Sequence, residues 1–326
     1  MSKPYSKPFL HLYIKRIAML LVKFTLVFVA FFFIYNKLVH NDTLDINSLL
    51  YYIDKYNIIT IRNLFILLLF SGCNWFLECL KWQLLVREIK TISLKKAIEQ
   101  SLGSLTASII TPNRIGEYGA KAIYFKKTYR KKIMGLNFVG NLSQLSTTLF
   151  FGVIGLIYTI NIFKLPISYF KLIGFVILTT GVIITYYKFL SKKEFEIKGH
   201  SFKKLNRFVS NLNRNTLYKS ILIAVFRYIC FSHQFYFLIC LLGIDVTYIE
   251  ALALIASMYL LVSVIPTVFV FDVLVKGSIA VWLFSFVNAN EFIIVTCITI
   301  MWFLNFALPS IIGSYFVLNF KLPKSQ

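Results

Sequence analysis

The sequence predicts an all-α, polytopic integral membrane protein, and three observations support this fold class. Hydrophobic residues make up 58% of the 326 residues, and the mean hydropathy is +0.73. Several windows hold about 20 mostly apolar residues, which is the length that a helix needs to cross about 30 Å of hydrocarbon. The basic residues lie in the short connections between these windows, as the positive-inside rule describes. The whole chain, 1–326, is therefore expected to form a single transmembrane domain.

Six apolar segments are long enough to be full crossings. The first follows a basic N-terminus and has no cleavage site of small residues, so we interpret it as a retained helix. The predicted crossings are 17–38, 64–86, 133–160, 168–190, 216–242 and 291–318.

Two other stretches, 93–127 and 249–287, each contain a short apolar run, a proline with polar neighbours and a second short run. Each half is too short or too polar to cross alone, so we expect two re-entrant helical hairpins. If the hairpins are counted as spanning, the total is about eight spans.

The charges of the connections predict the orientation. Lys and Arg cluster before and after the first hairpin, in 188–219 and in the C-terminal tail, whereas 39–58 and the flanks of the second hairpin are acidic. Both termini are thus expected in the cytoplasm, in a bacterial cytoplasmic membrane. The segments at about 60–160 and about 216–318 then become an inverted-topology repeat, a recurrent plan for transporters.

The net charge of +22 does not indicate nucleic-acid binding, because the basic residues form no single soluble face. It indicates topology first and contact with anionic lipid headgroups second. The five cysteines have no metal-ligand spacing, and we expect neither a metal nor a cofactor.

The stretch TPNRIGEYGAK at 111–121 is the main candidate site. Pro112 is expected to break the helix, and Gly116 permits a close turn. A charge at the bilayer centre costs at least about 2.5 kcal/mol, so charges at depth need partners. Glu117 and Lys121 are spaced i, i+4 and can pair, which leaves Arg114 to bind an anion. The alternative is that this break lies at the cytoplasmic surface, where its charges are solvated.

The second hairpin repeats this pattern weakly, with a break at Pro266, an acid at Asp272 and a base at Lys276. A substrate-binding role and a purely internal salt bridge remain alternatives for Asp272 and Lys276. Among the other polar residues inside crossings, Arg227 is the candidate for substrate binding. Asn137, Asn141 and Gln144 share one helix face and are interpreted as contacts between helices.

Pro112 to Lys121 is similar to the signature of the flippase-like membrane domain of lysylphosphatidylglycerol synthases, which has a Pro, an Arg, a Gly-Glu pair and a following base. The resemblance extends over nearly the whole chain in the order of its spans. Relatives often carry glycines in the second hairpin, whereas Pro266 to Asp272 reads PTVFVFD here. In that family, aminoacylation belongs to a separate soluble domain, so the resemblance implies lipid translocation by a stand-alone membrane domain and not lysyl transfer.

The expected partners are membrane lipids with an anionic headgroup. Two alternatives remain. One is a membrane-embedded glycosyl- or acyltransferase, and the other is a non-transporting accessory protein that binds an enzyme of envelope biosynthesis. A transferase would need catalytic acids or histidines in an outward loop. Catalytic residues are therefore not predicted.

Overall fold

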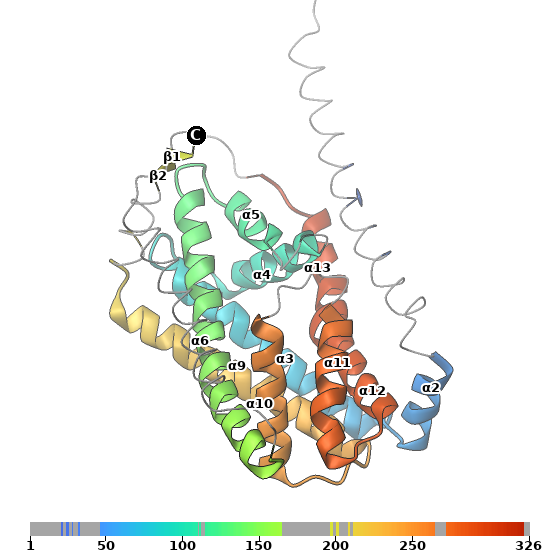
Figure 1. The fold of residues 1–326 in the computed structure, drawn as a ribbon. Coiled ribbons are helices and arrows are strands. Elements are labelled where there is room, and N and C mark those ends of the chain that lie inside the picture. Colours follow the sequence, from blue (N-terminus) through green and yellow to red (C-terminus); the bar gives the residue numbers. More distant parts are fainter. Residues whose placement is uncertain are drawn as a thin grey trace, which may run out of the picture.

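The structure is a computed structural model, and it describes residues 46–109, 111, 115–164, 196–197, 200–201, 208, 211–264 and 272–322, with five isolated positions near the N-terminus. These residues are almost entirely helical (Figure 1). The helices run in the order α2 Ile46–Lys55, α3 Ile61–Val86, α4 Leu94–Ser108, α5 Gly116–Ile123, α6 Arg130–Ile162, α9 Arg214–Leu241, α10 Tyr248–Val264, α11 Asp272–Phe284, the 3-10 turn η3 Ser285–Val287, α12 Glu291–Trp302, the π-helical turn η4 Phe303–Ala307 and α13 Leu308–Leu318.

Four helices of the described residues are long and apolar enough to cross a membrane. They are α3, α6, α9 and the continuous helix Glu291–Leu318 that joins α12, η4 and α13. They coincide with the segments predicted as crossings at 64–86, 133–160, 216–242 and 291–318, and confirm that each of these segments is a helix of sufficient length and apolar composition. The crossing at 168–190 lies outside the described residues, as does 17–38 except for isolated helical positions such as Phe24 and Phe28.

The two segments predicted as hairpins are each a pair of shorter helices. In the first, α4 ends at Ser108 and α5 begins at Gly116. In the second, α10 ends at Val264 and α11 begins at Asp272. The structure thus confirms an interruption of each segment. Of the residues predicted to cause the breaks, Pro112 and Pro266 lie outside the described residues.

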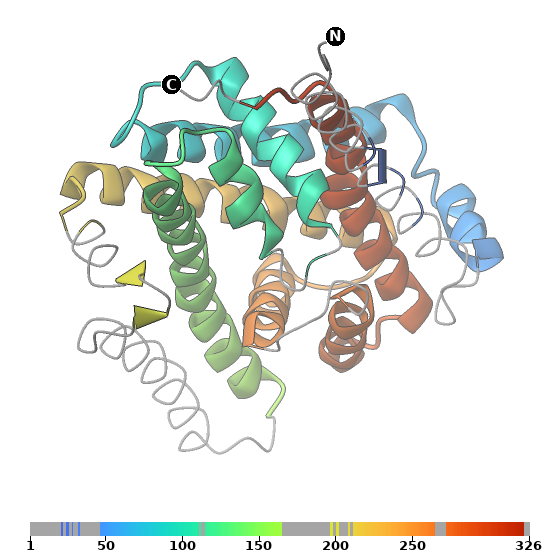
Figure 2. The ribbon, with the colours of Figure 1, turned by 90° about the horizontal axis from the view of Figure 1, so that it is seen from above.

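The connections gather at two opposite ends of the bundle. The α5–α6 connection and the end of α13 lie at the top of Figure 1, whereas the end of α6 and the α9–α10 and α11–α12 connections lie at the bottom. The top connection carries Lys126 and Lys127, and Asp245 and Glu250 belong to the bottom. The view from above shows α3 and α9 running side by side across the molecule, with α6 and α10 toward the lower part of the picture (Figure 2).

Two helix pairs approach so closely that only glycine fits at the contact. A Cβ on Gly155 of α6 would lie 2.6 Å from the Cβ of Ala256 on α10, and one on Gly313 of α13 would lie 2.2 Å from the carbonyl oxygen of Leu102 on α4. Thr106 of α4 also donates to the carbonyl of Ser310 at 2.7 Å. Small residues and side-chain hydrogen bonds are the usual means by which helices associate in lipid, where no hydrophobic effect drives them together.

Side chains that face outward from the bundle are largely apolar. Phe65 and Phe150, for example, are more than 60% exposed, as expected for helices whose solvent is hydrocarbon.

Helix α2 lies within 39–58, where the sequence predicted only an outward connection. Its residues Tyr52 and Ile53 pack on the apolar core. A small antiparallel pair, β1 Glu196–Ile197 and β2 His200–Ser201, lies in the basic 188–219 connection.

Candidate functional site

Glu78 of α3 is the centre of a buried cluster of charges. Its Oε2 atom lies 2.8 Å from Nζ of Lys81 on the same helix, and the same oxygen forms an ion pair with Nη1 of Arg227 on α9. Its Oε1 atom lies 3.9 Å from Nζ of Lys121 on α5. One carboxylate therefore joins cations from three helices that are far apart in the sequence.

Lys121 is held by a second set of contacts. Its ammonium lies 2.7 Å from Oε1 of Glu117, donates to Oδ1 of Asn137 at 2.8 Å and lies 4.4 Å from the ring centroid of Trp82. The Glu117–Lys121 pairing that the i, i+4 spacing predicted is thus confirmed. Only 1% of the Lys121 side chain is exposed, and a lysine at that depth is stable as a cation only if its hydrogen-bond donors are paired.

Arg227 has contacts on two of its three guanidinium nitrogens. Nε donates to Oδ1 of Asn74 at 3.0 Å, and Nη1 donates to Glu78 and to Oε1 of Gln144. Among the described residues no group accepts from Nη2. The interhelical hydrogen bonds of Asn137 and Gln144 agree with their interpretation as contacts between helices.

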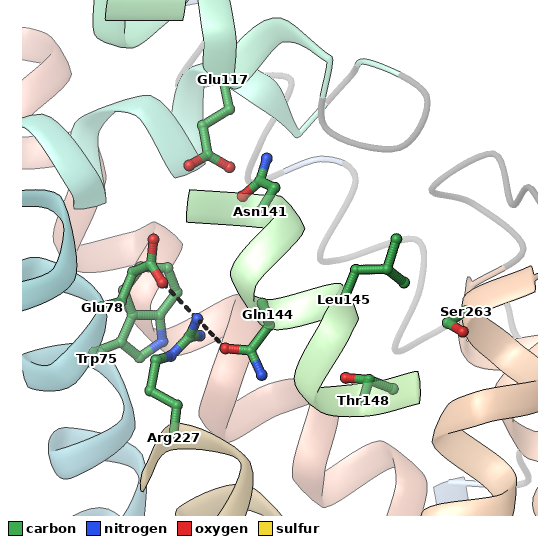
Figure 3. Close-up of a pocket in the computed structure, with 9 residues that line it drawn as sticks. All are labelled: Trp75, Glu78, Glu117, Asn141, Gln144, Leu145, Thr148, Arg227 and Ser263. Atoms are coloured by element: carbon green, nitrogen blue, oxygen red, sulfur yellow. Dashed lines mark hydrogen bonds and ion pairs between the residues drawn. The ribbon is translucent and has the colours of Figure 1, made fainter. Parts of the chain in front are cut away.

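Three of these charged groups, Glu78, Glu117 and Arg227, line a cavity of about 470 Å³ (Figure 3). Arg227 enters it from α9 and Glu78 from α3, and Glu117 points toward it from the opposite side. Ser263, near the end of α10, lies at its far edge. The cavity is lined by Trp75, Glu78, Glu117, Asn141, Gln144, Leu145, Thr148, Arg227 and Ser263. Residues from both interrupted segments, α4/α5 and α10/α11, therefore border one space.

Among the described residues, the cluster has one more cation than it has carboxylates. Among the described residues it contains the cations Lys81, Lys121 and Arg227 and the carboxylates Glu78 and Glu117. Three cations and two carboxylates leave a net charge of +1, which is costly in a low-dielectric interior. An anionic ligand in the cavity would remove that excess and would find a guanidinium, whose planar fork suits phosphate and carboxylate.

Two buried amides add hydrogen-bond donors without acceptors. Nε2 of Gln144 and Nδ2 of Asn137 have no hydrogen-bond partner in the part of the chain that the structure describes. A buried donor that is left unpaired costs about 1–3 kcal/mol. Because Gln144 lines the cavity beside Arg227, this donor too favours a ligand with several acceptor oxygens.

A chain of side-chain amides leads from the cluster toward the other end of α3. Asn74, which accepts from Arg227, donates to Oδ1 of Asn305 at 2.9 Å. Asn305 donates in turn to Oε1 of Gln234 at 2.7 Å, and Gln234 donates to the carbonyl of Leu67 at 2.9 Å. The charged cluster is thereby tied to the π-helical turn η4, which contains Asn305.

The structure brings together three of the six residues predicted to bind substrate, namely Glu117, Lys121 and Arg227. Arg114 lies outside the described residues. Asp272 begins α11, but its side chain is not described. Lys276 is partly buried in α11 and is not among the described residues that line the cavity. The proposed roles of Arg114, Asp272 and Lys276 therefore stay predictions.

Gly116 has the close packing that its predicted role requires. Its amide donates to Oγ1 of Thr111 at 2.9 Å, and a Cβ at this position would lie 2.8 Å from Cγ2 of the same threonine. Any larger residue would push the start of α5 away from the segment that follows α4.

Sequence reasoning missed the central position of Glu78. The i, i+3 spacing of Glu78 and Lys81 is compatible with the pair that they form, but this spacing alone indicates only a local contact on α3. A usable signal was present, because Glu78, Lys81 and Arg227 are charged residues within apolar spans and an unpaired charge there is unfavourable. Matching cations to anions across spans would have linked Glu78 to Arg227.

Among the described residues, no group of three or more His, Cys, Asp or Glu side chains could hold a metal ion.

The fold and the site define a multi-pass, all-helical membrane protein with a charged cavity inside its helix bundle.

Residues 17–313 of the 326 match the family model described as the lysylphosphatidylglycerol synthase TM region, so the chain belongs to that family. This confirms the resemblance drawn from Pro112 to Lys121. A comparison with curated proteins found no match.

Proposed function

We propose that this protein translocates a lipid or a lipid-linked precursor with an anionic headgroup across the membrane. The observation that carries the proposal is the cavity, which lies among the helices and is bordered by Arg227, whose Nη2 has no acceptor among the described residues, and by the unpaired amide donor of Gln144. Family membership agrees with a role in lipid handling. A buried charged site between helices is costly to build, and such sites commonly mark substrate pathways in membrane proteins.

The proposed architecture has six crossings and two re-entrant hairpins. In it, α4/α5 dips from the cytoplasmic side and α10/α11 dips from outside, which makes 60–160 and 216–318 inverted repeats. Two observations support this. The cavity is bordered by Glu117 of α5 and by Ser263 of α10, and basic and acidic connections lie at opposite ends of the bundle. Rocking one repeat against the other would expose the cavity alternately to each side.

In this proposal Arg227 and Arg114 bind the anionic headgroup, and Lys121 contributes positive potential from its place beside Glu117. Glu117 and Asp272 balance charge or couple protons when the cavity is empty. Lys276 belongs to the second hairpin, where it takes part in the same balance of charge as Asp272. The protein would act in the bacterial cytoplasmic membrane with both termini in the cytoplasm.

The direct test is lipid flipping by the purified protein in phosphatidylcholine vesicles that contain fluorescent phosphatidylglycerol, with the outer leaflet bleached by dithionite. We expect Arg227→Gln to slow flipping about tenfold, because a charge-assisted hydrogen bond is worth about 1.5 kcal/mol or more. Arg114→Gln should act in the same direction. Arg214→Gln is the matched control, since Arg214 lies on the same helix but is exposed and outside the cavity.

Arg227→Lys separates a role in binding from a role in folding, because it keeps the charge that balances Glu78 but loses the planar fork. We expect it to elute as the wild type does and still to flip slowly. The proposal would be abandoned if the wild-type protein did not accelerate flipping. It would also be abandoned if the protein, supplied with an activated sugar or acyl donor, converted the lipid into a new product.

A further inference from the structure

The continuous helix Glu291–Leu318 has two halves that pack on different parts of the bundle. Its first half, α12, lies against α9 and against α11 of the second interrupted segment. Its second half, α13, lies against α4 of the first interrupted segment (Figure 1). The π-helical turn η4 joins the two halves. Any motion of the first interrupted segment relative to the second must therefore bend this helix or break one of these contacts.

The contacts on both halves are extensive enough to be kept during such a motion. A Cβ on Gly313 of α13 would lie 2.2 Å from the carbonyl oxygen of Leu102 on α4, and Thr106 donates to the carbonyl oxygen of Ser310. On the other half, Ile294 of α12 belongs to the same apolar core as buried side chains of α9 and α11. The bend is therefore expected between the two halves.

The turn η4 has two features that make a helix easy to bend. The amide of Leu308 donates to the carbonyl oxygen of Phe303, five residues earlier and not four. Pro309 follows and has no amide hydrogen to donate. Sharp kinks, of more than about 20°, occur mostly at prolines and π-helical turns. The helix can bend here without losing further regular hydrogen bonds.

Helix α3 connects η4 to the charged cavity. Asn74 donates to Oδ1 of Asn305 in η4 at 2.9 Å and accepts from Nε of Arg227 at 3.0 Å. It is 5% exposed and is not among the described residues that line the cavity. The next residue, Trp75, lines the cavity and also donates to the carbonyl oxygen of Asn305. A bend that moves Asn305 relative to α3 would therefore disturb the contacts of Arg227.

Asn74 also fixes the plane of the Arg227 guanidinium. Nε is held by Asn74, and Nη1 is held by Glu78 and Gln144. Because the guanidinium is planar, these two anchors set the direction of Nη2. An anion that binds Nη2 binds best while both anchors are made, and it stabilises the arrangement that it binds best. Occupation of the cavity should thus favour the contact between Asn74 and η4.

We propose that η4 is the hinge of the motion that exposes the cavity, and that Asn74 is the positioning residue that couples this hinge to an anionic headgroup at Arg227. This inference rests on the proposed function and deepens it, because it assigns the moving part and its link to the ligand. With the headgroup bound, Asn305 stays on Asn74. Without it, the helix exchanges with a second state in which α13 has moved together with α4.

Distances between spin labels test the hinge. The full-length protein without its native cysteines is labelled at Tyr218→Cys on α9 and Tyr315→Cys on α13. The reference pair is Tyr218→Cys with Phe292→Cys on α12, and all three positions are more than half exposed. Position 315 lies about 15 Å beyond Asn305 along the helix, so a bend of about 20° would move it by about 5 Å.

The distances are measured in phosphatidylcholine nanodiscs with and without phosphatidylglycerol. We expect phosphatidylglycerol to shift the distance between 218 and 315 by up to about 5 Å and to leave the distance between 218 and 292 unchanged. An unchanged distance between 218 and 315, or an equal shift in both pairs, would overturn the hinge.

Asn305→Leu is the uncoupling variant, because it removes the link to η4 and leaves Asn74 beside Arg227. Its matched control is Thr299→Val, which removes a hydroxyl that bonds to the Val295 carbonyl of its own helix. We expect the response to phosphatidylglycerol to be lost in Asn305→Leu and kept in Thr299→Val. If Asn305→Leu does not fold, Asn305→Ser replaces it, since a serine is too short to reach Asn74. A full response in the Asn305 variant would overturn the coupling.

Flipping rates at increasing phosphatidylglycerol content separate positioning from coupling. Asn74→Leu should raise the content needed for half-maximal flipping about fivefold, because Arg227 loses an anchor. Asn305→Leu should lower the maximal rate about fivefold and change the half-maximal content less than about twofold, because Arg227 keeps that anchor. If both variants changed only the amount of folded protein, with normal rates per folded molecule, their roles would be purely structural and the proposal would fail.

The hinge and the proposed function fail in different ways, because the label distances are measured without any flipping. Flipping by the wild-type protein with no shift between 218 and 315 would refute the hinge alone. A shift caused by phosphatidylglycerol in a protein that does not flip lipid would refute the proposed function alone.

Discussion

The indole Nε1 of Trp75 on α3 donates a hydrogen bond to the carbonyl oxygen of Asn305 at 3.0 Å. In a regular helix that carbonyl would accept from residue 309, but residue 309 is a proline and has no amide hydrogen. The neighbouring carbonyl of Leu304 accepts from Oγ of Ser71 at 2.6 Å. Two side chains of α3 thus satisfy the backbone groups that Pro309 and the π-helical turn leave free, as membrane helices require.

The first prediction concerns this contact. Trp75→Phe should destabilise the protein by about 1–3 kcal/mol, because the carbonyl of Asn305 would be buried without a donor. The effect would appear as a lower unfolding midpoint in detergent micelles. Trp282→Phe is the control, since Trp282 is 45% exposed. In a Pro309→Ala background, where residue 309 regains its amide hydrogen, the cost of Trp75→Phe should shrink; an equal cost in both backgrounds would refute this explanation.

A second prediction concerns the contact between α4 and α13. Gly313→Ala should lower stability by several kcal/mol, because the added Cβ would lie 2.2 Å from the carbonyl oxygen of Leu102 and the helices would have to separate. Gly72→Ala on α3 is the matched control, since nothing lies within 4 Å of the Cβ added there. It should be neutral or stabilise by up to about 1 kcal/mol through helix propensity. Similar unfolding midpoints for the two variants would contradict the packing argument.

A third prediction compares a buried carboxylate with an exposed one. Glu78→Gln should cost about 3–5 kcal/mol, because it leaves Lys81, Lys121 and Arg227 with Glu117 as the one carboxylate of the cluster among the described residues. Glu99→Gln removes a pair with Lys96, whose side chain is 60% exposed, and should cost at most about 1 kcal/mol.

The double variant Glu78→Gln with Arg227→Leu completes a thermodynamic cycle for this pair. It should be less destabilised than the sum of the two single variants, because it removes a cation together with the carboxylate that balanced it. Strict additivity would mean that the two residues do not interact.

The fourth prediction concerns orientation. In a background without the native cysteines, Lys127→Cys between α5 and α6 should react with a membrane-impermeant maleimide only after the membrane is opened. Ser285→Cys between α11 and α12 should react in intact cells. Both positions are exposed, and the expectation follows from the basic and acidic character of the two connections. Labelling of both from the same side would refute the proposed topology.

The crossings could be predicted because length and apolar composition are local properties of a segment. The separation of α4 from α5 and of α10 from α11 was predictable for a similar reason, since each segment contains a proline between short apolar runs. The Glu117–Lys121 pair followed from i, i+4 spacing alone. Helix α2 was missed because ten residues of mixed polarity are too short to be recognised as a crossing.

The sequence by itself determined that this chain is a multi-pass helical membrane protein, where its helices break and which family it resembles, because each of these depends on residues close together in the chain. Only the tertiary structure decided that Glu78 joins Lys81, Lys121 and Arg227, that residues of α3, α5, α6, α9 and α10 line one charged cavity, and that Trp75 completes the hydrogen bonding at Pro309. The physical reason is that these partners lie up to 230 positions apart, so their contacts depend on how helices cross.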